Sequence, residues 1–150
     1  MEKNLCLEHK VVLKVAQAND LPVLFSLVDD YDGDVQVNKT RIKNAIREIV
    51  YVQGAVIAEV DRQVIGAVVG YALPCLYNDD VIFSVMFFYV RKQYRKFTKD
   101  IVRELELVLL PTKVNLIAYG FIVNQDYLKL QRYMKILGYK EIGTHLAKRI

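Results

Sequence analysis

The sequence predicts an α/β domain with a mixed central sheet of about six or seven strands, flanked by helices. Short β-branched runs alternate with segments of helical periodicity, in the order β-α-α-β-β-β-α-β-α-β. The longest apolar run, residues 81–90, has the length of a strand and lies in the middle of the chain. It leads into a basic segment and a helix, so we expect a crossover to a parallel strand.

The composition indicates a globular protein. The 150 residues are 53% hydrophobic and 25% charged, and no repeat or linker interrupts them, so residues 1–150 are expected to form a single domain. Cys6 and Cys75 match no metal-ligand spacing, which predicts reduced thiols in a cytoplasmic protein and no metal site. The sequence has no signal-peptide core and no apolar run long enough to cross a bilayer, so no membrane partner is expected.

The first elements follow from local residue preferences. Residues 11–16 are mostly β-branched and predict a strand. Residues 19–22, Asn-Asp-Leu-Pro, predict a helix start, because a capping side chain and a proline both suit a first helical turn; this helix should reach about Val28. The acidic residues 29–34 are interpreted as a solvated loop rather than a cation site, because the later Glu of an EF-hand loop is missing.

The later elements follow from periodicity and turn residues. Helical spacing of Ile42, Ala45, Ile46 and Ile49 predicts a second helix over residues 38–50. The remaining predictions are a hairpin of strands 54–60 and 64–73, the central strand 81–90, a helix 100–110, a strand 114–122, a helix 124–137 and one or two short strands at 140–142 and 145–149.

The segment after the central strand is strongly basic. Five basic residues fall within nine positions: Arg91, Lys92, Arg95, Lys96 and Lys99. A buried strand that delivers basic residues to a helix N-terminus favours phosphate binding, because the helix dipole and its unpaired N–H groups attract anions. A solvated helix face is an alternative. Nucleic acid, with Tyr94 and Phe97 as stacking groups, ranks below the phosphate interpretation because the formal net charge is only +4.

Three segments resemble one known family. Residues 15–22 resemble its first strand and capped helix, and Tyr89–Arg95 resembles its fourth strand leading into a pyrophosphate loop. Residues 133–144 resemble its closing helix, its turn of glycine and an aromatic residue, and its final strands. With the order of elements, the chain resembles the GCN5-related N-acetyltransferase (GNAT) superfamily over nearly its whole length. The small size is also like that of phage-encoded members.

This resemblance implies an acyl-CoA-dependent N-acetyltransferase that transfers an acetyl group from acetyl-CoA to a small-molecule or protein amine. It also implies a splayed sheet that holds the thioester between strands 81–90 and 114–122, and a homodimer as an expected state. The residues implied to bind the cofactor are Phe88 and Val90 on the strand edge, and Arg95, Lys96, Phe97, Thr98, Lys99 and Asp100 in the loop.

The chain departs from the family pattern in the loop and at the catalytic positions. Thr98 and Asp100 stand where the family carries glycines, so cationic side chains would have to bind the phosphates. Tyr133, beside Met134 at the position where the family often has a tyrosine, is the expected acid for the leaving thiolate.

The general base and the activity itself are open in the sequence. The central strand carries no Glu; Ser84 is the polar side chain in its interior, and Glu59, Asp79 and Asp80 are the nearest carboxylates. The missing glycines also favour a second hypothesis, a catalytically inactive domain of GNAT type with a structural or protein-interaction role.

Overall fold

The computed structural model describes residues 9–33, 36–119 and 125–141, with residues 125–130 described as backbone only. These residues belong to two compact units, Met1–Gly120 and Phe121–Ile150. Whether the whole chain behaves as the single predicted domain stays a prediction. Within the described residues, no helix is both long and apolar enough to cross a membrane.

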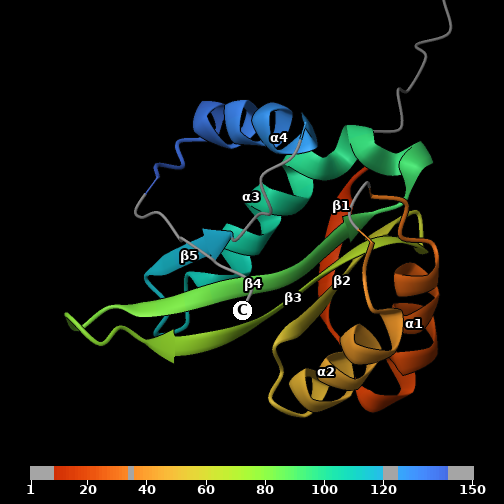
Figure 1. The fold of residues 1–150 in the computed structure, drawn as a ribbon, viewed down its shortest axis with the longest axis horizontal. Coiled ribbons are helices and arrows are strands. Elements are labelled where there is room, and N and C mark those ends of the chain that lie inside the picture. Colours follow the sequence, from red (N-terminus) through yellow and green to blue (C-terminus); the bar gives the residue numbers. More distant parts are fainter. Residues whose placement is uncertain (1–8, 34–35, 120–124, 142–150) are drawn as a thin grey trace, which may run out of the picture. The chain divides into compact units, whose positions relative to one another are not determined.

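The first unit contains a five-stranded sheet whose strands lie in chain order (Figure 1). The strands are β1 (Val11–Val15), β2 (Ala55–Val60), β3 (Gln63–Pro74), β4 (Val81–Val90) and β5 (Leu116–Tyr119). The first three pairings are antiparallel and the β4–β5 pairing is parallel, which confirms the predicted mixed sheet.

The described residues hold fewer strands than the six or seven predicted. Lys140 and Glu141 are not in a strand, and residues 142–150, which carry the rest of the predicted terminal strands, lie outside the described residues. The predicted strand 114–122 is observed over Leu116–Tyr119. Its last predicted residues, 120–122, also lie outside the description.

The helices of the first unit begin close to the predicted positions. They are the 3-10 helix η1 (Ala18–Asp20), α1 (Leu21–Asp29), α2 (Lys39–Tyr51), the 3-10 helix η2 (Lys92–Phe97) and α3 (Thr98–Leu109). Asn38 caps α2, since its Oδ1 accepts a hydrogen bond from the Arg41 N–H at 2.9 Å. Asp20 instead accepts from the Gln17 N–H at 2.9 Å, and this bond, with Lys14 nearby, lowers the pKa of the Asp20 carboxyl.

Two apolar cores sandwich the sheet. On one face α1 and α2 bury residues such as Leu24, Leu27 and Ile49 against β2, β3 and the end of β4. On the other face α3 buries Ile101 and Leu105 against the same strands. Because both faces are covered, β2, β3 and β4 read as nearly continuous apolar runs in the sequence.

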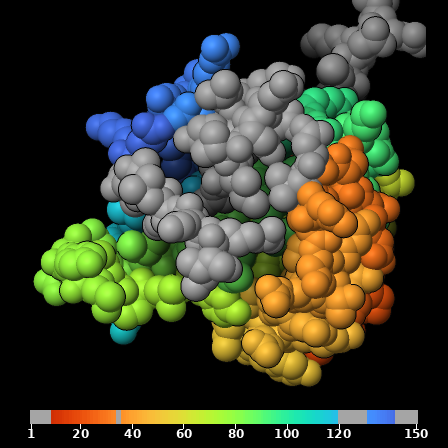
Figure 2. All heavy atoms as spheres, viewed as in Figure 1, coloured from red at the N-terminus to blue at the C-terminus, as the bar shows by residue number. Residues whose placement is uncertain are grey.

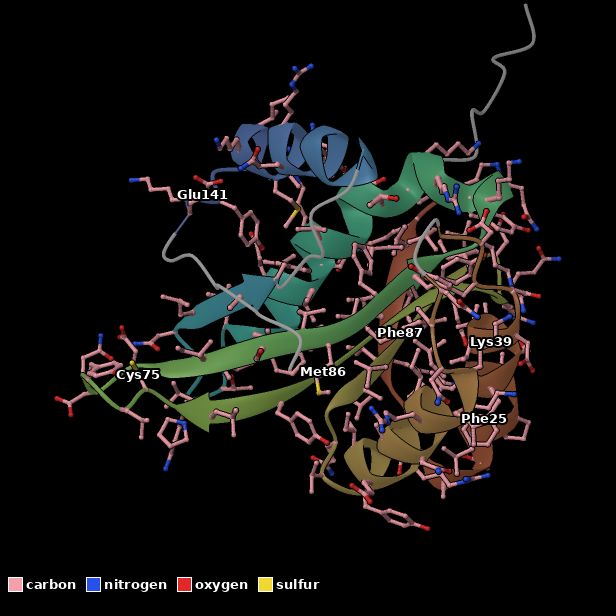
Figure 3. The ribbon with its side chains drawn as sticks, in the orientation of Figure 1. Phe25, Lys39, Cys75, Met86, Phe87 and Glu141 are labelled. Carbon is pink, nitrogen blue, oxygen red and sulfur yellow. The ribbon has the colours of Figure 1, made fainter. Side chains whose placement is uncertain are left out.

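A β-bulge at Met86 interrupts the alternation of side chains on β4, so residues on its two sides that are two positions apart lie on opposite faces of the sheet. Val85 pairs with Gly70 and Phe87 pairs with Val69, so Met86 has no partner on β3 (Figure 3). Val85 belongs to the α3-side core, whereas Phe87 belongs to the core under α1 and α2. Gly70 allows the close approach, since a Cβ there would lie 2.3 Å from the Ser84 carbonyl oxygen. Gly70 therefore serves strand packing.

Asn115 joins the starts of β4 and β5. Its Oδ1 accepts a hydrogen bond from the Val81 N–H at 2.8 Å, and its Nδ2 donates to Asp80 Oδ1 at 2.7 Å. The backbone adds the bond from the Asn115 N–H to the Val81 carbonyl at 3.1 Å. These contacts fix the register in which β4 pairs with β5 after the α3 crossover.

In the second unit, α4 spans Gln125–Ile136, as predicted to within a residue at each end. Gly138 follows it with a φ of 92°. The Gly138 N–H donates to the Lys135 carbonyl and the Tyr139 N–H to the Met134 carbonyl, both at 3.0 Å. This is a Schellman motif, and it ends the helix within a residue of the predicted end at position 137.

Candidate functional site

The C-terminal half of β4 has an open backbone edge. β5 pairs with β4 only from Ile82 to Val85, while β4 continues to Val90. The Arg91 N–H donates to the Ile65 carbonyl on β3 at 2.8 Å, so by strand alternation Phe88 and Val90 direct their backbone groups away from β3. No strand in the described part of the chain pairs with that edge, which makes it able to bind an extended ligand.

Apolar side chains support this edge from the α3 side. Val90 is buried in the α3-side core, and Phe88 packs against the same core. The Phe88 ring lies 6.0 Å from the Tyr119 ring, measured between centroids, with the rings tilted. The edge is therefore rigidly held.

The basic segment after β4, residues 91–99, which we call the basic loop, has helical backbone from its first residues. Arg91 precedes the 3-10 helix, the Tyr94 N–H donates to the Arg91 carbonyl at 2.8 Å, and α3 follows without a break. The Thr98 N–H and hydroxyl both donate to the Arg95 carbonyl, the hydroxyl at 2.7 Å. Because this segment contains no glycine that would interrupt a helix, the helical backbone begins before the predicted helix start at Asp100. The backbone of Thr98 is thus engaged within the loop.

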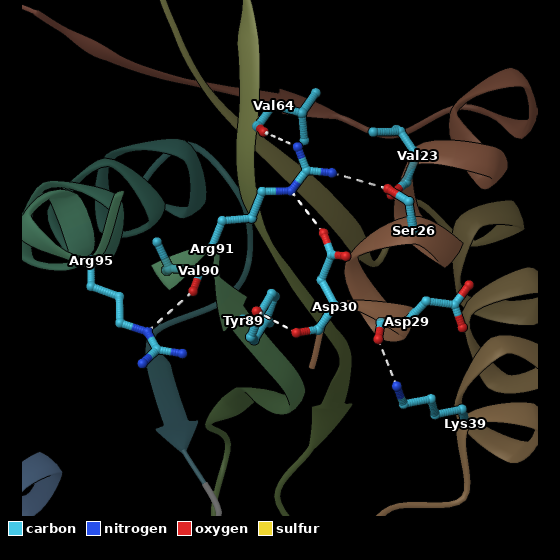
Figure 4. A network of polar contacts seen from close by, with 10 residues as sticks. All are labelled: Val23, Ser26, Asp29, Asp30, Lys39, Val64, Tyr89, Val90, Arg91 and Arg95. Atoms are coloured by element: carbon cyan, nitrogen blue, oxygen red, sulfur yellow. Dashed lines mark hydrogen bonds and ion pairs between the residues drawn. The ribbon is translucent and has the colours of Figure 1, made fainter. Parts of the chain in front are cut away.

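Arg91 is fixed by contacts with three other segments (Figure 4). Its Nη1 donates to the Val64 carbonyl at 3.3 Å and its Nη2 donates to the Ser26 hydroxyl at 3.1 Å. Its Nε lies 3.2 Å from Asp30 Oδ2 in an ion pair without hydrogen-bond geometry. The guanidinium therefore ties the end of β4 to β3 and to the end of α1.

Arg95 contacts the acidic loop, which we define as residues 29–33. Its Nη2 forms an ion pair with Asp32 Oδ1, and its Nε donates to the Val90 carbonyl at 3.4 Å. The acidic loop is exposed, as the solvated-loop interpretation expects. However, each carboxylate of its described residues pairs with a cation: Asp29 with Lys43, Asp30 with Arg91 and Asp32 with Arg95. Sequence analysis missed these partners, which are distant along the chain.

A polar cleft of about 470 Å³ lies between the acidic loop and the basic loop. It is lined by Asp30, Asp32, Tyr89, Arg91, Lys92 and Gln93. At its base the Tyr89 hydroxyl donates to the Asp30 carbonyl at 2.7 Å. Burial, followed by the charge of Asp32, raises the pKa of Tyr89, so this hydroxyl stays protonated at neutral pH.

The other loop residues that the resemblance implied have mixed environments. The Lys96 ammonium lies 5.0 Å from the centroid of the Phe97 ring, and Phe97 itself packs against the α3-side core. Lys99 and Asp100 are exposed on the first turn of α3. The structure therefore brings the β4 edge, Arg95 and the start of α3 to one end of the sheet. Their role in cofactor binding stays a prediction.

The catalytic candidates from the sequence are distributed over both units. Tyr133 is a half-buried residue of α4 in the second unit, and its catalytic role also stays a prediction. Glu59 lies 3.6 Å from the Lys14 ammonium on β1. Asp80 bonds Asn115 and Asn78 at the start of β4, the opposite end from Val90, with Asp79 exposed beside it.

Ser84 is half-buried on β4, opposite Tyr71.

In the residues that the structure describes, no group of three or more His, Cys, Asp or Glu side chains could hold a metal ion. Cys75 is a half-buried free cysteine at the tip of the β3–β4 hairpin.

No protein-family model matches the chain, and no curated protein matches it by sequence. Among solved structures it is similar to a possible acetyltransferase from Clostridium difficile 630, with a TM-score of 0.73 and 9% identity, over 94% of this chain and 97% of that one.

It is also similar to a ribosomal-protein-alanine N-acetyltransferase from Brucella melitensis biovar Abortus 2308, with a TM-score of 0.69 and 17% identity, over 93% of this chain and 99% of the other. A GNAT family acetyltransferase from Staphylococcus aureus subsp. aureus USA300_TCH1516 matches with a TM-score of 0.68 and 14% identity, over 94% and 99% of the two chains. At these identities the similarity shows the fold: the chain folds as GNAT acetyltransferases do.

Proposed function

We propose that this chain is an acyl-CoA-dependent N-acetyltransferase that transfers an acetyl group to an amine. The observation that carries the proposal is the open edge of β4 at Phe88 and Val90, in a fold shared with acetyltransferases. Such an edge can exchange backbone hydrogen bonds with the amide groups in the arm of coenzyme A. Fold alone does not assign an activity, so the proposal depends on this edge and on the basic loop beside it.

The residues present fit this cofactor in two parts. Phe88 and Val90 lie on the edge of β4 that no described strand pairs with, where the Val90 carbonyl accepts a long hydrogen bond from Arg95. The adjoining loop offers the cations Arg95, Lys96 and Lys99 for the phosphates. Acetyl-CoA, when bound, supplies the acetyl group as a thioester. The amine nitrogen would form the new N–C bond as the C–S bond breaks. The Tyr133 hydroxyl is proposed to give its proton to the leaving sulfur, and the proton that the nitrogen loses restores the hydroxyl through solvent. The acceptor is proposed to be a small-molecule or protein amine.

The first test is the melting temperature of the full chain with and without millimolar acetyl-CoA. A ligand that binds only the folded state raises the melting temperature, by about 4 °C or more when its concentration is far above the Kd. The double variant R95A/K96A should lose most of that rise. Release of free coenzyme A in the presence of an amine acceptor, measured by chromatography, then tests turnover.

The matched control is the double variant R103A/K113A. It removes the same two charges from exposed positions on α3 and on the segment after it, away from the basic loop. It should keep the full rise in melting temperature. Equal loss in both double variants would mean that only net charge matters, and no rise in the native chain would overturn the proposal.

A second candidate is a protein-interaction domain without turnover. The β3–β4 hairpin projects away from α1 and α2 (Figure 2). At its tip Leu76 and Tyr77 are 92% and 94% exposed, which is unusual for large apolar side chains. This candidate predicts no thermal shift with acetyl-CoA, so the same measurement separates the two functions.

A further inference from the structure

We propose that the acidic loop competes with the phosphates of the cofactor for Arg95, through the carboxylate of Asp32. This inference rests on the proposed function, since it concerns the same site. It assigns to Asp32 an autoinhibitory contact: in the absence of cofactor, the protein supplies its own anion to the cation that the phosphates need.

The contacts of Arg95 show why it can change partners. In the described part of the chain its guanidinium pairs with Asp32, donates a long hydrogen bond to the Val90 carbonyl and interacts with the Tyr89 hydroxyl. The two side chains of the ion pair are 49% and 41% exposed, so solvent reaches both. An exposed pair of this kind is weak and easily opened. Arg91 differs, because three segments hold it and its side chain is only 29% exposed.

The acidic loop is held in place on the N-terminal side of Asp32. The Tyr89 hydroxyl donates to the Asp30 carbonyl at 2.7 Å, and the Lys39 ammonium donates to the Asp29 carbonyl at 2.6 Å (Figure 4). Lys43 adds an ion pair to Asp29 at 2.7 Å. The chain thus anchors the loop just before Asp32, which keeps the carboxylate at a high local concentration beside Arg95.

A phosphate and a carboxylate offer the same kind of acceptor to a guanidinium. Asp32 lines the cleft and pairs with Nη2 of Arg95, which is not among the lining residues, so a phosphate that binds this side of the guanidinium displaces Asp32 or shares its hydrogen bonds. Binding of the cofactor phosphates is then coupled to release of Asp32 from Arg95. The competing ion pair therefore lowers the apparent affinity of the chain for the cofactor. The linkage also means that cofactor binding releases the Asp32 carboxylate from Arg95.

The test is the Kd of free coenzyme A for the full-length native chain and for Asp32→Asn, by calorimetry at one fixed salt concentration. We expect the variant to bind about two to five times more tightly, the range that corresponds to an exposed ion pair. Asp29→Asn is the control. It removes the same charge from the same loop, but its partner is Lys43 on α2, so it should change the Kd less than Asp32→Asn does.

A double-mutant cycle separates competition from general repulsion. In the Arg95→Gln background, Asp32→Asn should leave the Kd nearly unchanged, because the contact that it removes is already gone. Inorganic pyrophosphate is the second probe and should show the same pattern if the phosphates compete.

The outcomes are distinct. If the native chain binds coenzyme A and Asp32→Asn binds equally or more weakly, Asp32 positions Arg95 and the inference is wrong while the proposed function stands. An equal gain in Asp29→Asn, or a full gain in the Arg95→Gln background, also overturns the inference. If no variant binds coenzyme A, the proposed function fails and the inference with it.

Discussion

At the scale of single residues, Gly70 sets the shape of β4. The bulge at Met86 requires the Ser84 carbonyl to approach the β3 backbone, and a Cβ at Gly70 would lie 2.3 Å from that oxygen. We expect Gly70→Ala to lower the free energy of unfolding by about 2 kcal/mol, as overpacking against rigid backbone does. Urea denaturation measures this change.

Ala72→Ser is the control for that substitution. Ala72 is exposed on the same strand, so the change should alter the free energy of unfolding by less than about 0.5 kcal/mol. Equal stability of Gly70→Ala and the native protein would contradict the tight strand approach that the structure shows.

The residue scale is also where sequence analysis failed most. The basic run of residues 91–99 and the acidic run of residues 29–34 were both visible, yet their pairing was not. Arg91 meets Asp30 and Arg95 meets Asp32 only because α1 ends beside the end of β4. Local patterns carry no signal for ion pairs between segments some sixty residues apart, such as Arg95 and Asp32, which are separated by 63 positions.

At the scale of elements, the side-chain hydrogen bonds of Asn115 to Val81 and Asp80 hold the parallel strands β4 and β5 together. Asn115→Ala should remove both side-chain bonds and leave the Val81 N–H without this acceptor. We expect a loss of about 1–3 kcal/mol in stability, with faster hydrogen exchange at Ile117 and Tyr119. Hydrogen exchange followed by NMR measures both effects.

Asn78→Ala is the matched control for Asn115→Ala. Asn78 bonds Asp80 within the hairpin loop, with a side-chain bond at 2.9 Å, and does not reach β5. Its removal should leave the protection of β5 unchanged. If both variants exchange alike at β5, Asn115 is not what holds the strand.

The boundaries of most elements were predictable, whereas the bulge was not. Capping residues gave the start of α1, helical periodicity gave α2, turn residues gave the β2–β3 hairpin, and Gly138 follows the end that was predicted for α4. The run of residues 81–90 is apolar on both faces of the strand, so a shift of one residue leaves no trace in its pattern. The 3-10 helix before α3 was also missed, because Lys92–Phe97 carries no cap or breaker that marks it.

At the scale of the whole molecule, the fold is shared with acetyltransferases at 9% to 17% identity. The order of elements and the burial of both sheet faces are enough to specify it, which explains why sequence patterns predicted the fold class. The candidate site depends on fewer residues. Its strand edge follows from topology, since the described residues of β5 pair with β4 from Ile82 to Val85 and no described strand covers Phe88 and Val90.

The most direct test of the account is an NMR titration of the full chain with coenzyme A, observed at the backbone amides of β4. The N–H groups of Phe88 and Val90 face the open edge, whereas those of Phe87 and Tyr89 face β3, by the alternation that the Arg91 N–H to Ile65 bond sets. We predict large shifts at Phe88 and Val90 and smaller ones at Phe87 and Tyr89. Unchanged β4 amides at saturating coenzyme A would contradict the account.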